Sequence, residues 1–266
     1  MAYQALYRKY RPKRFQDVIG QEHITTILKN QILEGHVAHA YLFTGTRGTG
    51  KTSTAKIFAK ALNCDAPIAG EPCGECPSCR IAETGGVDII ELDAASNTGV
   101  EDMRALIDKA RFAPLDLRVK VYIIDEAHML SKSAFNALLK TLEEPPAHVV
   151  FILATTEPQS IPATIVSRCQ RFDFHRLRVE DIVSCMESVL KSAGASIAPE
   201  GMVAIARAAE GGMRDAWSIM DMCLSYAQEE DGGLTEELVL RVLGAADKSF
   251  LFAFADKLID SDAAGA

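Results

Sequence analysis

The chain has 266 residues, of which 48% are hydrophobic and 24% are charged. This apolar share is enough for a packed core and excludes a wholly disordered chain. Aspartate and glutamate number 36 against 28 lysines and arginines, so the formal net charge at pH 7 is −8. Sequence-independent binding of nucleic acid needs a basic surface, and the acidic balance argues against this function for the chain by itself.

Neither a membrane span nor a secretory signal is expected. No apolar run approaches the roughly 18 residues that a membrane-spanning helix needs. The N-terminal stretch MAYQALYRKYRPKRF is positively charged but lacks the apolar segment of a signal peptide. We therefore expect a cytoplasmic protein with no membrane partner. Disulfides are rare in that compartment, so the seven cysteines need another explanation.

Short apolar runs alternate with helical patterns through the first two-thirds of the chain. The runs are rich in β-branched and aromatic residues and show little internal alternation, which is typical of strands covered on both faces of a parallel sheet. The expected strands are residues 40–44, 87–92, 119–125, 149–155 and 171–174. The expected helices between them are residues 22–33, 51–62, 100–110 and 131–142. This order predicts an open α/β sheet of five parallel strands, with ligands beyond their carboxyl ends.

From about residue 179 the strand patterns stop and helical patterns continue. These cover residues 180–192, 200–209, 214–227 and 236–243, separated by Pro199 and by the glycine pairs at 211–212 and 232–233. We expect an α/β domain over 1–177 and a small all-helical domain over 178–243. Residues 244–266 would begin a further helical region that is truncated or has a mobile tail.

The strongest motif is GTRGTGKT, residues 45–52, which matches G-x-x-x-x-G-K-[ST] in full. It follows an expected strand and opens an expected helix, which is the context that a phosphate-binding loop (P-loop) requires. Its glycines let backbone N–H groups surround phosphates, Lys51 would reach the β- and γ-phosphates, and the Thr52 hydroxyl would ligate Mg²⁺. The alternative is a chance glycine-rich turn, which this context disfavours.

Polar side chains follow two other expected strands. VYIIDEAH places Asp125 and Glu126 at the end of a buried strand, where Asp125 suits the Mg²⁺ shell and Glu126 suits a base that polarises the attacking water. Thr155 and Thr156 end the strand 149–155, and a hydroxyl there could orient the water or sense the γ-phosphate. The alternatives are a carboxylate that caps the next helix and a solvated strand end.

Four cysteines are spaced Cys64-x8-Cys73-x2-Cys76-x2-Cys79. All-sulfur ligation at this spacing favours a tetrahedral Zn²⁺ site, in a module of about residues 63–80. An iron–sulfur cluster and free thiols remain as alternatives. The segment has almost no apolar residues and no general acid or base nearby in sequence. We therefore expect a structural site whose metal supplies the folding energy.

Two arginines stand in short motifs, Arg168 in SRC and Arg214 in GGMRDAW. Spacing alone favours a surface ion pair of little energetic weight for each of them. In their order along the chain, however, GTRGTGKT, IIDEAHMLS, LLKTLEEPP, ATT, SRC and GMRDA resemble the motifs of clamp-loader ATPases of the AAA+ class. The opening LYRKYRPKRFQDVIGQEH and the four-cysteine insertion narrow the resemblance to the gamma/tau family of bacterial DNA polymerase III. It extends from about Tyr3 to Leu243.

The resemblance implies an AAA+ ATPase domain with an inserted zinc module and a helical lid. Arg168 would be an arginine finger that acts in trans on a neighbouring subunit, and Arg214 would contact nucleotide from the lid. Thr156 would be the polar sensor, and Lys51, Glu126 and Arg168 would act with it in catalysis. The resemblance also implies a base pocket, the adenine pocket of the nucleotide site, lined by Tyr7, Arg11, Pro12, Val18 and Ile19. The other nucleotide-binding residues implied are Gly45, Thr46, Arg47, Gly48, Thr49, Gly50, Lys51, Thr52, Ser53, Met213 and Arg214.

The implied function is hydrolysis of ATP to open a sliding clamp and load it on primed DNA during replication, without polymerase chemistry of its own. The implied partners are other clamp-loader subunits in a pentameric ring, the clamp and primer–template DNA, with polymerase and helicase joining through further C-terminal segments. A helix from about Val100 would face DNA. Asn97 and Gly99 at its start are neutral where relatives are more basic, which leaves Arg104 and Lys140 as candidates for contact.

Two rival functions remain at this stage. A scaffold subunit without turnover would not need the intact P-loop and carboxylates. Another AAA+ motor, such as a Holliday-junction helicase, would not explain the four cysteines or the SRC motif.

Overall fold

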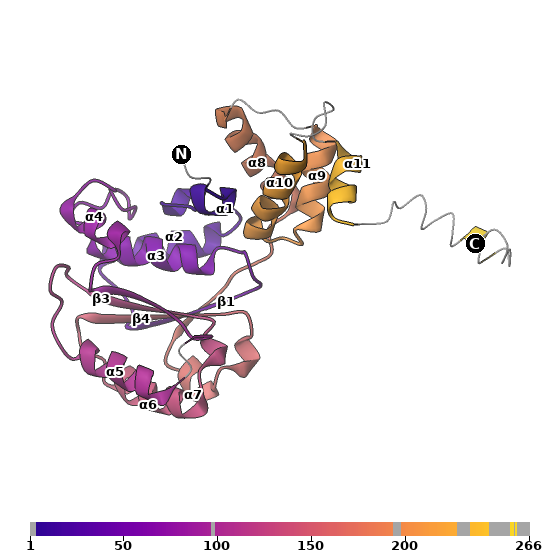
Figure 1. Ribbon diagram of the computed structural model, residues 1–266. Coiled ribbons are helices and arrows are strands. Elements are labelled where there is room, and N and C mark those ends of the chain that lie inside the picture. The colour runs from indigo at the N-terminus through magenta and orange to yellow at the C-terminus, as the bar shows by residue number, and fades with distance from the viewer. Residues whose placement is uncertain are drawn as a thin grey trace. The chain divides into compact units, whose positions relative to one another are not determined.

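The computed structural model describes residues 4–96, 99–193, 198–227, 235–244, 256–257 and 259 (Figure 1). The chain divides into two compact units, one over residues 11–176 and one combining 1–10 with 177–266. The sequence prediction placed residues 1–10 in the first domain, whereas the structure groups them with the helical unit. The physical reason is that the short helix α1 (Leu6–Lys9) packs on a helix of that unit. The predicted helical region over 244–266 lies almost wholly outside the described residues.

The larger unit contains a five-stranded parallel sheet in the order β2-β3-β4-β1-β5. The strands are β1 (Ala40–Thr44), β2 (Ile89–Asp93), β3 (Lys120–Asp125), β4 (Val149–Thr155) and β5 (Gln170–Asp173). The three central strands β3, β4 and β1 are buried almost throughout, as continuous apolar runs require. The predicted open α/β sheet is confirmed.

Helices cover both faces of this sheet (Figure 1). One face carries α2 (Glu22–Glu34) and α3 (Lys51–Asn63), and the other carries α5 (Val100–Ala110) and α6 (Lys132–Glu143). Each helix turns an apolar stripe to the sheet, so two hydrophobic clusters form, one on each face. The shorter helices are α4 (Pro77–Thr84), α7 (Ala163–Val166) and the 3-10 turns η1 (Phe15–Asp17), η2 (Ala127–Met129) and η3 (Pro158–Ser160).

The helical unit has its own core. Its helices are α1, α8 (Val179–Ala193), α9 (Pro199–Ala208), α10 (Met213–Ala227) and α11 (Glu236–Val242). Ile182, Ile205, Trp217 and Met220 are among the buried residues that these helices share. Within the described residues no helix is long and apolar enough to cross a membrane.

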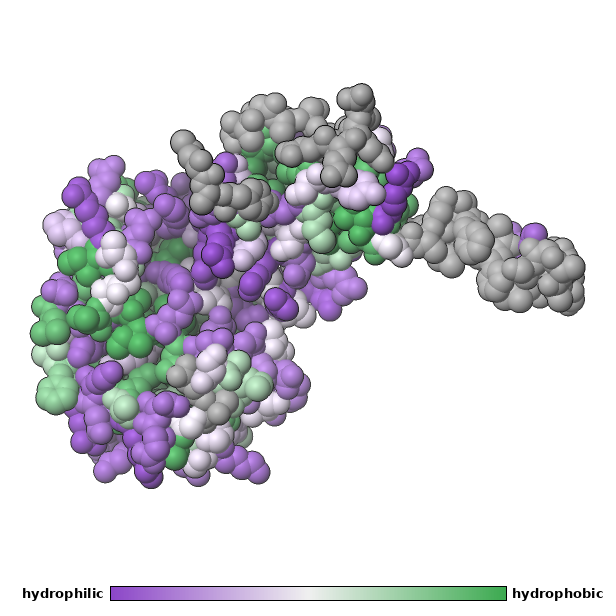
Figure 2. All heavy atoms as spheres, viewed as in Figure 1, coloured by the Kyte–Doolittle hydropathy of each residue, from purple (hydrophilic) through white to green (hydrophobic). Residues whose placement is uncertain are grey.

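The two ends of the sheet differ in surface character. In Figure 2 a group of apolar residues lies at the end of the larger unit where β3 and β4 begin. Phe112 and Leu115, which are 70% and 80% exposed, belong to the loop that leads into β3. The opposite ends of the strands carry the polar residues on which the sequence analysis centred.

Candidate nucleotide-binding site and metal site

The loop between β1 and α3 has a backbone that only glycine adopts readily. Gly45, Gly48 and Gly50 have φ of 144°, 78° and 101°. A Cβ atom at Gly45 would lie 2.5 Å from the carbonyl oxygen of Phe174, so a side chain there is excluded by contact as well as by conformation. The loop leads directly into the first turn of α3, whose free N–H groups favour an anionic ligand.

Lys51 is the first residue of α3, and its side chain turns back into the loop. It is only 6% exposed, and its Nζ donates to the carbonyl oxygens of Gly45 at 2.8 Å and Thr46 at 2.9 Å. Burial lowers the pKa of Lys51, while the negative charges of Glu126 and Asp125 act in the opposite direction. The ammonium group is thus held inside a loop of backbone donors, which fits a phosphate ligand.

Thr52 and Asp125 meet although they are distant in sequence. The Thr52 hydroxyl donates to Asp125 Oδ2 at 2.7 Å, and Asp125 Oδ1 accepts the N–H of Glu126 at 3.0 Å. A hydroxyl and a carboxylate are hard oxygen ligands of the kind that Mg²⁺ prefers beside phosphates. The residues present therefore fit the magnesium site that the sequence predicts.

Glu126 and Thr156 also come together. The Thr156 hydroxyl donates to Glu126 Oε2 at 3.1 Å. Glu126 has a φ of 47°, an uncommon left-handed conformation for a residue with a side chain, and such strain is found mostly at functional sites. Thr155, by contrast, contacts His128, whose Nδ1 lies 3.0 Å from the Thr155 hydroxyl.

Sequence reasoning missed His128. Its Nδ1 lies 3.5 Å from Glu126 Oε2, so His128, like Thr156, lies next to the carboxylate of the expected base Glu126. Its approach depends on η2, a single tight turn directly after the two carboxylates that brings position 128 back toward the strand end, and this turn was not predicted from the sequence.

The segment of residues 11–19 lies beside the P-loop. Arg11 Nε donates to Ser53 Oγ at 3.0 Å, and a Cβ at Gly50 would lie 3.7 Å from Val18 Cγ1. Pro12 and Ile19 are half-buried members of the same segment. The structure thus brings two of the predicted base-pocket residues to the phosphate loop.

The remaining predicted nucleotide contacts belong to the helical unit. The guanidinium carbon of Arg214 lies 5.1 Å from the centre of the Tyr7 ring, within the range of a cation–π contact. Met213 is the first residue of α10, directly before Arg214. Tyr7 and Arg214, which were predicted from separate motifs, are therefore neighbours.

Arg168 follows α7 and makes an ion pair within its own chain. Its Nη2 lies 2.7 Å from Glu143 Oε1, and its Nη1 donates to the Thr164 carbonyl oxygen at 2.7 Å. The side chain is still 34% exposed. In this chain it matches the surface ion pair that spacing alone favoured.

The four clustered cysteines converge in space. Their Sγ atoms all lie within 4.8 Å of one another, with 4.0 Å between Cys64 and Cys76 and 3.9 Å between Cys73 and Cys79. A tetrahedron with Zn–S bonds of about 2.3 Å has edges of about 3.8 Å, so the cluster fits zinc. This is the one such group of potential ligands within the described residues.

Backbone N–H groups point at these sulfurs, as in a formed metal site. Cys73 donates to the Cys64 sulfur at 3.3 Å, and Cys79 donates to the Cys76 sulfur at 3.3 Å. Backbone N–H groups of Glu75 and Cys76 lower the pKa of the Cys73 thiol to about 6, whereas burial raises the pKa of Cys64 and Cys79. A bound cation would hold all four as thiolates.

The sheet, the P-loop and the strand-end carboxylates define an α/β domain of the AAA+ ATPase type, followed by a helical unit. Solved structures of RuvB from Thermotoga maritima, one described as a Holliday junction branch migration motor, share this fold. That structure matches with a TM-score of 0.65 at 20% identity and covers 88% of this chain and 72% of its own. At this identity the likeness shows the fold alone.

Comparison with related sequences identifies the family within the AAA+ ATPases. The family described as "DNA polymerase III, delta subunit" matches residues 20–178, and "DNA polymerase III clamp loader subunit, ATPase lid domain" matches residues 181–229. DNA polymerase III subunit tau of Bacillus subtilis is 52% identical over 100% of this chain and 47% of its own length. Subunit tau of Escherichia coli is 48% identical over 98% of this chain and 40% of its own. Subunit gamma of Buchnera aphidicola subsp. Baizongia pistaciae is 41% identical over 98% and 70%.

The chain belongs to the tau/gamma family of DNA polymerase III clamp-loader subunits, which confirms the resemblance found in the sequence. It spans less than half the length of the tau relatives.

Proposed function

We propose that this chain is the ATP-hydrolysing part of a bacterial clamp loader, which opens a sliding clamp and loads it on primed DNA. Its partners are other loader subunits in a pentameric ring, the clamp and primer–template DNA, in the cytoplasm. Polymerase and helicase join through other segments. The observation that carries the proposal is the meeting of Lys51, Thr52, Asp125, Glu126 and Thr156 at one edge of the sheet.

Each of these residues has a distinct task. Lys51 exchanges the carbonyl oxygens of Gly45 and Thr46 for the β- and γ-phosphate oxygens of ATP. Thr52 and Asp125 hold Mg²⁺, which when bound neutralises charge on the phosphates. Residues 45–53 supply the other phosphate contacts. Further nucleotide contacts are assigned to Arg11, Pro12, Val18 and Ile19 in the larger unit and to Tyr7, Met213 and Arg214 in the helical unit.

Hydrolysis then requires an oriented water molecule. Glu126 polarises that water once its carboxylate is free to face the water. Thr156, which donates to the same carboxylate, orients the water and senses the γ-phosphate. Arg168 of a neighbouring chain stabilises the developing charge. The rate enhancement comes from positioning and charge neutralisation, with no covalent intermediate.

The four cysteines hold a structural Zn²⁺. Support comes from the fit of their spacing to a tetrahedron and from the N–H groups directed at the sulfurs. We assign residues 1–177 to the ATPase domain, of which residues 1–10 group with the helical unit, and residues 178–243 to the lid.

The test compares wild type with Lys51→Ala in equilibrium binding of a fluorescent ATP analogue in the presence of Mg²⁺. Lys51 supplies the charge inside the loop, so we expect its removal to raise the Kd at least tenfold, about 1.4 kcal/mol. Lys56→Ala on the same helix removes a lysine that pairs with Glu91 outside the loop and is the matched control. Equal affinities for wild type and Lys51→Ala would contradict the proposal and favour a scaffold without a working site.

A further inference from the structure

The four-cysteine module touches the segment that borders the nucleotide loop. The Glu71 carboxylate accepts the backbone N–H of Phe15 at 2.8 Å and of Gln16 at 3.1 Å. Its side chain is only 15% exposed, and Lys29 Nζ lies 3.7 Å from the same carboxylate. Glu71 thus accepts hydrogen bonds from two consecutive backbone donors, one of which belongs to the buried residue Phe15.

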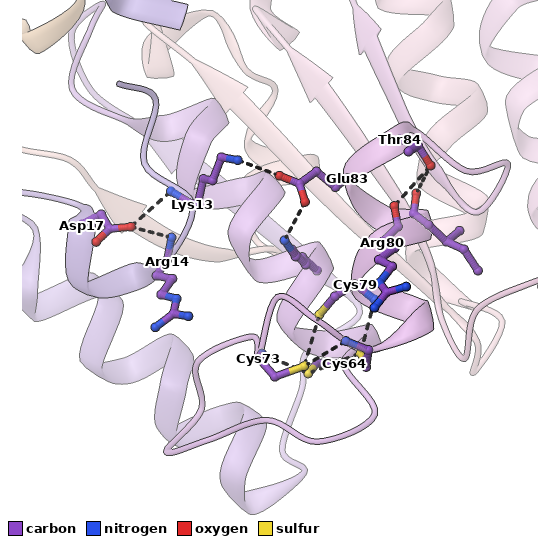
Figure 3. A network of polar contacts seen from close by, with 12 residues as sticks. Lys13, Arg14, Asp17, Cys64, Cys73, Cys79, Arg80, Glu83 and Thr84 are labelled. Carbon is purple, nitrogen blue, oxygen red and sulfur yellow. Dashed lines mark hydrogen bonds and ion pairs between the residues drawn. The ribbon is translucent and has the colours of Figure 1, made fainter. Parts of the chain in front are cut away.

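A second contact comes from α4. The Glu83 carboxylate accepts the Lys13 ammonium at 2.9 Å and lies 3.6 Å from Lys60 of α3 (Figure 3). The view shows the Lys13 side chain directed at Glu83, with labelled cysteines beside the helix that carries Glu83. The module, through Glu71, and the helix α4 that continues from it, through Glu83, therefore hold residues 13–16 at two points.

The turn that presents Glu71 fits closely against α2. Ala69 and Gly70 have φ of 51° and 79°, and Ile68 and Glu71 exchange backbone hydrogen bonds across this turn. A Cβ at Gly70 would lie 2.8 Å from the Lys29 carbonyl oxygen. Because Cys73 follows Glu71 by two residues, a metal that fixes the cysteines also fixes this turn.

The held segment continues in both directions to the P-loop. Before it, Arg11 donates to Ser53. Phe15 within the segment and Val18 after it are buried in the core beside α3, and Val18 faces Gly50. Movement of residues 13–16 would therefore displace Arg11 and Val18, which border the nucleotide loop. It would displace Lys51 much less, because the loop itself holds that side chain.

We propose that Glu71 is a positioning residue, through which the four-cysteine module holds residues 11–19 in place to bind the nucleoside part of ATP. The inference rests on the proposed function. It assigns the metal module a task in ligand affinity beyond its own folding.

The test uses Glu71→Ala, with Glu71→Gln as the conservative variant and exposed Glu75→Ala in the same module as the control. Two probes are bound in the presence of Mg²⁺, ATP and inorganic tripolyphosphate. The second lacks the nucleoside and reports on the P-loop alone. Zinc content and hydrogen exchange at the amides of Phe15 and Gln16 are measured on the same samples.

We expect Glu71→Ala to keep its zinc, to exchange both amides faster, and to raise the Kd for ATP about tenfold, or about 1.4 kcal/mol. Binding of tripolyphosphate should not change. Glu71→Gln keeps one acceptor oxygen, so its Kd for ATP should lie between those of Glu71→Ala and wild type. The Kd of Glu75→Ala should equal that of wild type.

An unchanged Kd for ATP despite faster exchange would overturn the inference, and so would equal losses for both probes, which indicate general destabilisation. If Glu71→Ala loses its zinc, Glu83→Ala is tested in its place. This variant should weaken ATP binding about threefold and leave tripolyphosphate binding unchanged. Absence of this selective loss would overturn the inference. Failure of wild type to bind either probe would instead contradict the proposed function.

Discussion

Tyr122 lies on β3 with its ring fully buried and stacked on Phe151 at 5.4 Å between ring centres. Its hydroxyl has no hydrogen-bond partner within the described part of the chain. Burial, and secondarily the charge of Asp88, raises the pKa of Tyr122 to about 12, and burial likewise raises that of Tyr41 to about 12. An unpartnered buried hydroxyl costs free energy of folding.

We therefore predict that Tyr122→Phe leaves stability unchanged or raises it at pH 7. The unfolded tyrosine ionises near pH 10 and the folded one near pH 12, so each buried tyrosine destabilises the fold as the pH rises through this interval, by at most about 1.4 kcal/mol per pH unit. Removing one of the two buried tyrosines should make the loss of folding stability with rising pH less steep. Urea unfolding between pH 8 and 11 measures this.

Tyr226→Phe, at an exposed tyrosine, is the control and should follow wild type. A Tyr122→Phe chain that lost stability in parallel with wild type above pH 10 would contradict the assignment.

At the scale of residues, sequence predicts local chemistry well and tertiary partners poorly. The P-loop is contiguous, so its glycines and Lys51 could be placed from spacing. Thr52 and Asp125 could be brought together because a parallel sheet aligns its strand ends. Glu71 escaped notice, since a lone glutamate carries no pattern and its partners are set only by packing. Glu143 stands in the LLKTLEEPP motif, but its pairing with Arg168 is likewise set by packing.

Helix α1 is fastened to α10 by a few side chains. The N–H of Leu6 donates to Asp221 Oδ2 at 2.8 Å, and the Tyr10 ring stacks on Trp217 at 5.4 Å between centres. A helix of this length has little stability of its own, so its attachment depends on such contacts.

We predict that Asp221→Ala frees α1, because the N–H of Leu6 loses its acceptor. Amides of residues 6–10 should exchange at least tenfold faster, as measured by hydrogen exchange with mass spectrometry. Glu200→Ala, at an exposed position in the first turn of α9, should leave α1 unchanged. Unaltered exchange in Asp221→Ala would show that the aromatic stack alone holds the helix.

At the scale of elements, the main strands and long helices followed from periodicity, but α4 did not. Residues 77–84 have few apolar side chains, and the helix starts at Pro77 with the Cys76 sulfur accepting the N–H of Cys79. Its formation depends on the cysteine cluster, and no periodic pattern could reveal it. The four-residue helices α1 and α7 are likewise too short to leave a period.

At the scale of the assembled molecule, each ATP site is proposed to need Arg168 of a neighbouring subunit, because Arg168 within one chain pairs with Glu143. We predict that Arg168→Ala lowers ATP hydrolysis about 10³-fold in a complex with partner subunits, clamp and primed DNA, the lower end of the effect of an arginine finger. The isolated chain should be unaffected, because its own Arg168 pairs with Glu143. Steady-state ATPase assays with and without partners make the comparison.

Arg241→Ala, at an exposed arginine in a helical ion pair, should retain activity in both conditions. An equal loss of activity in the isolated Arg168→Ala chain would place the arginine in its own site and refute action in trans.

The strand order has a consequence for biosynthesis. β1 is synthesised first, yet its two neighbours in the sheet are β4 and β5, near the end of the unit. As the chain leaves the ribosome, the strand that leads into the P-loop stays without hydrogen-bonding partners until residues 149–173 have emerged. Such non-local pairing is slow and leaves apolar strands exposed. Chaperones that shield nascent chains should therefore matter more for the yield of this domain than for its stability once folded.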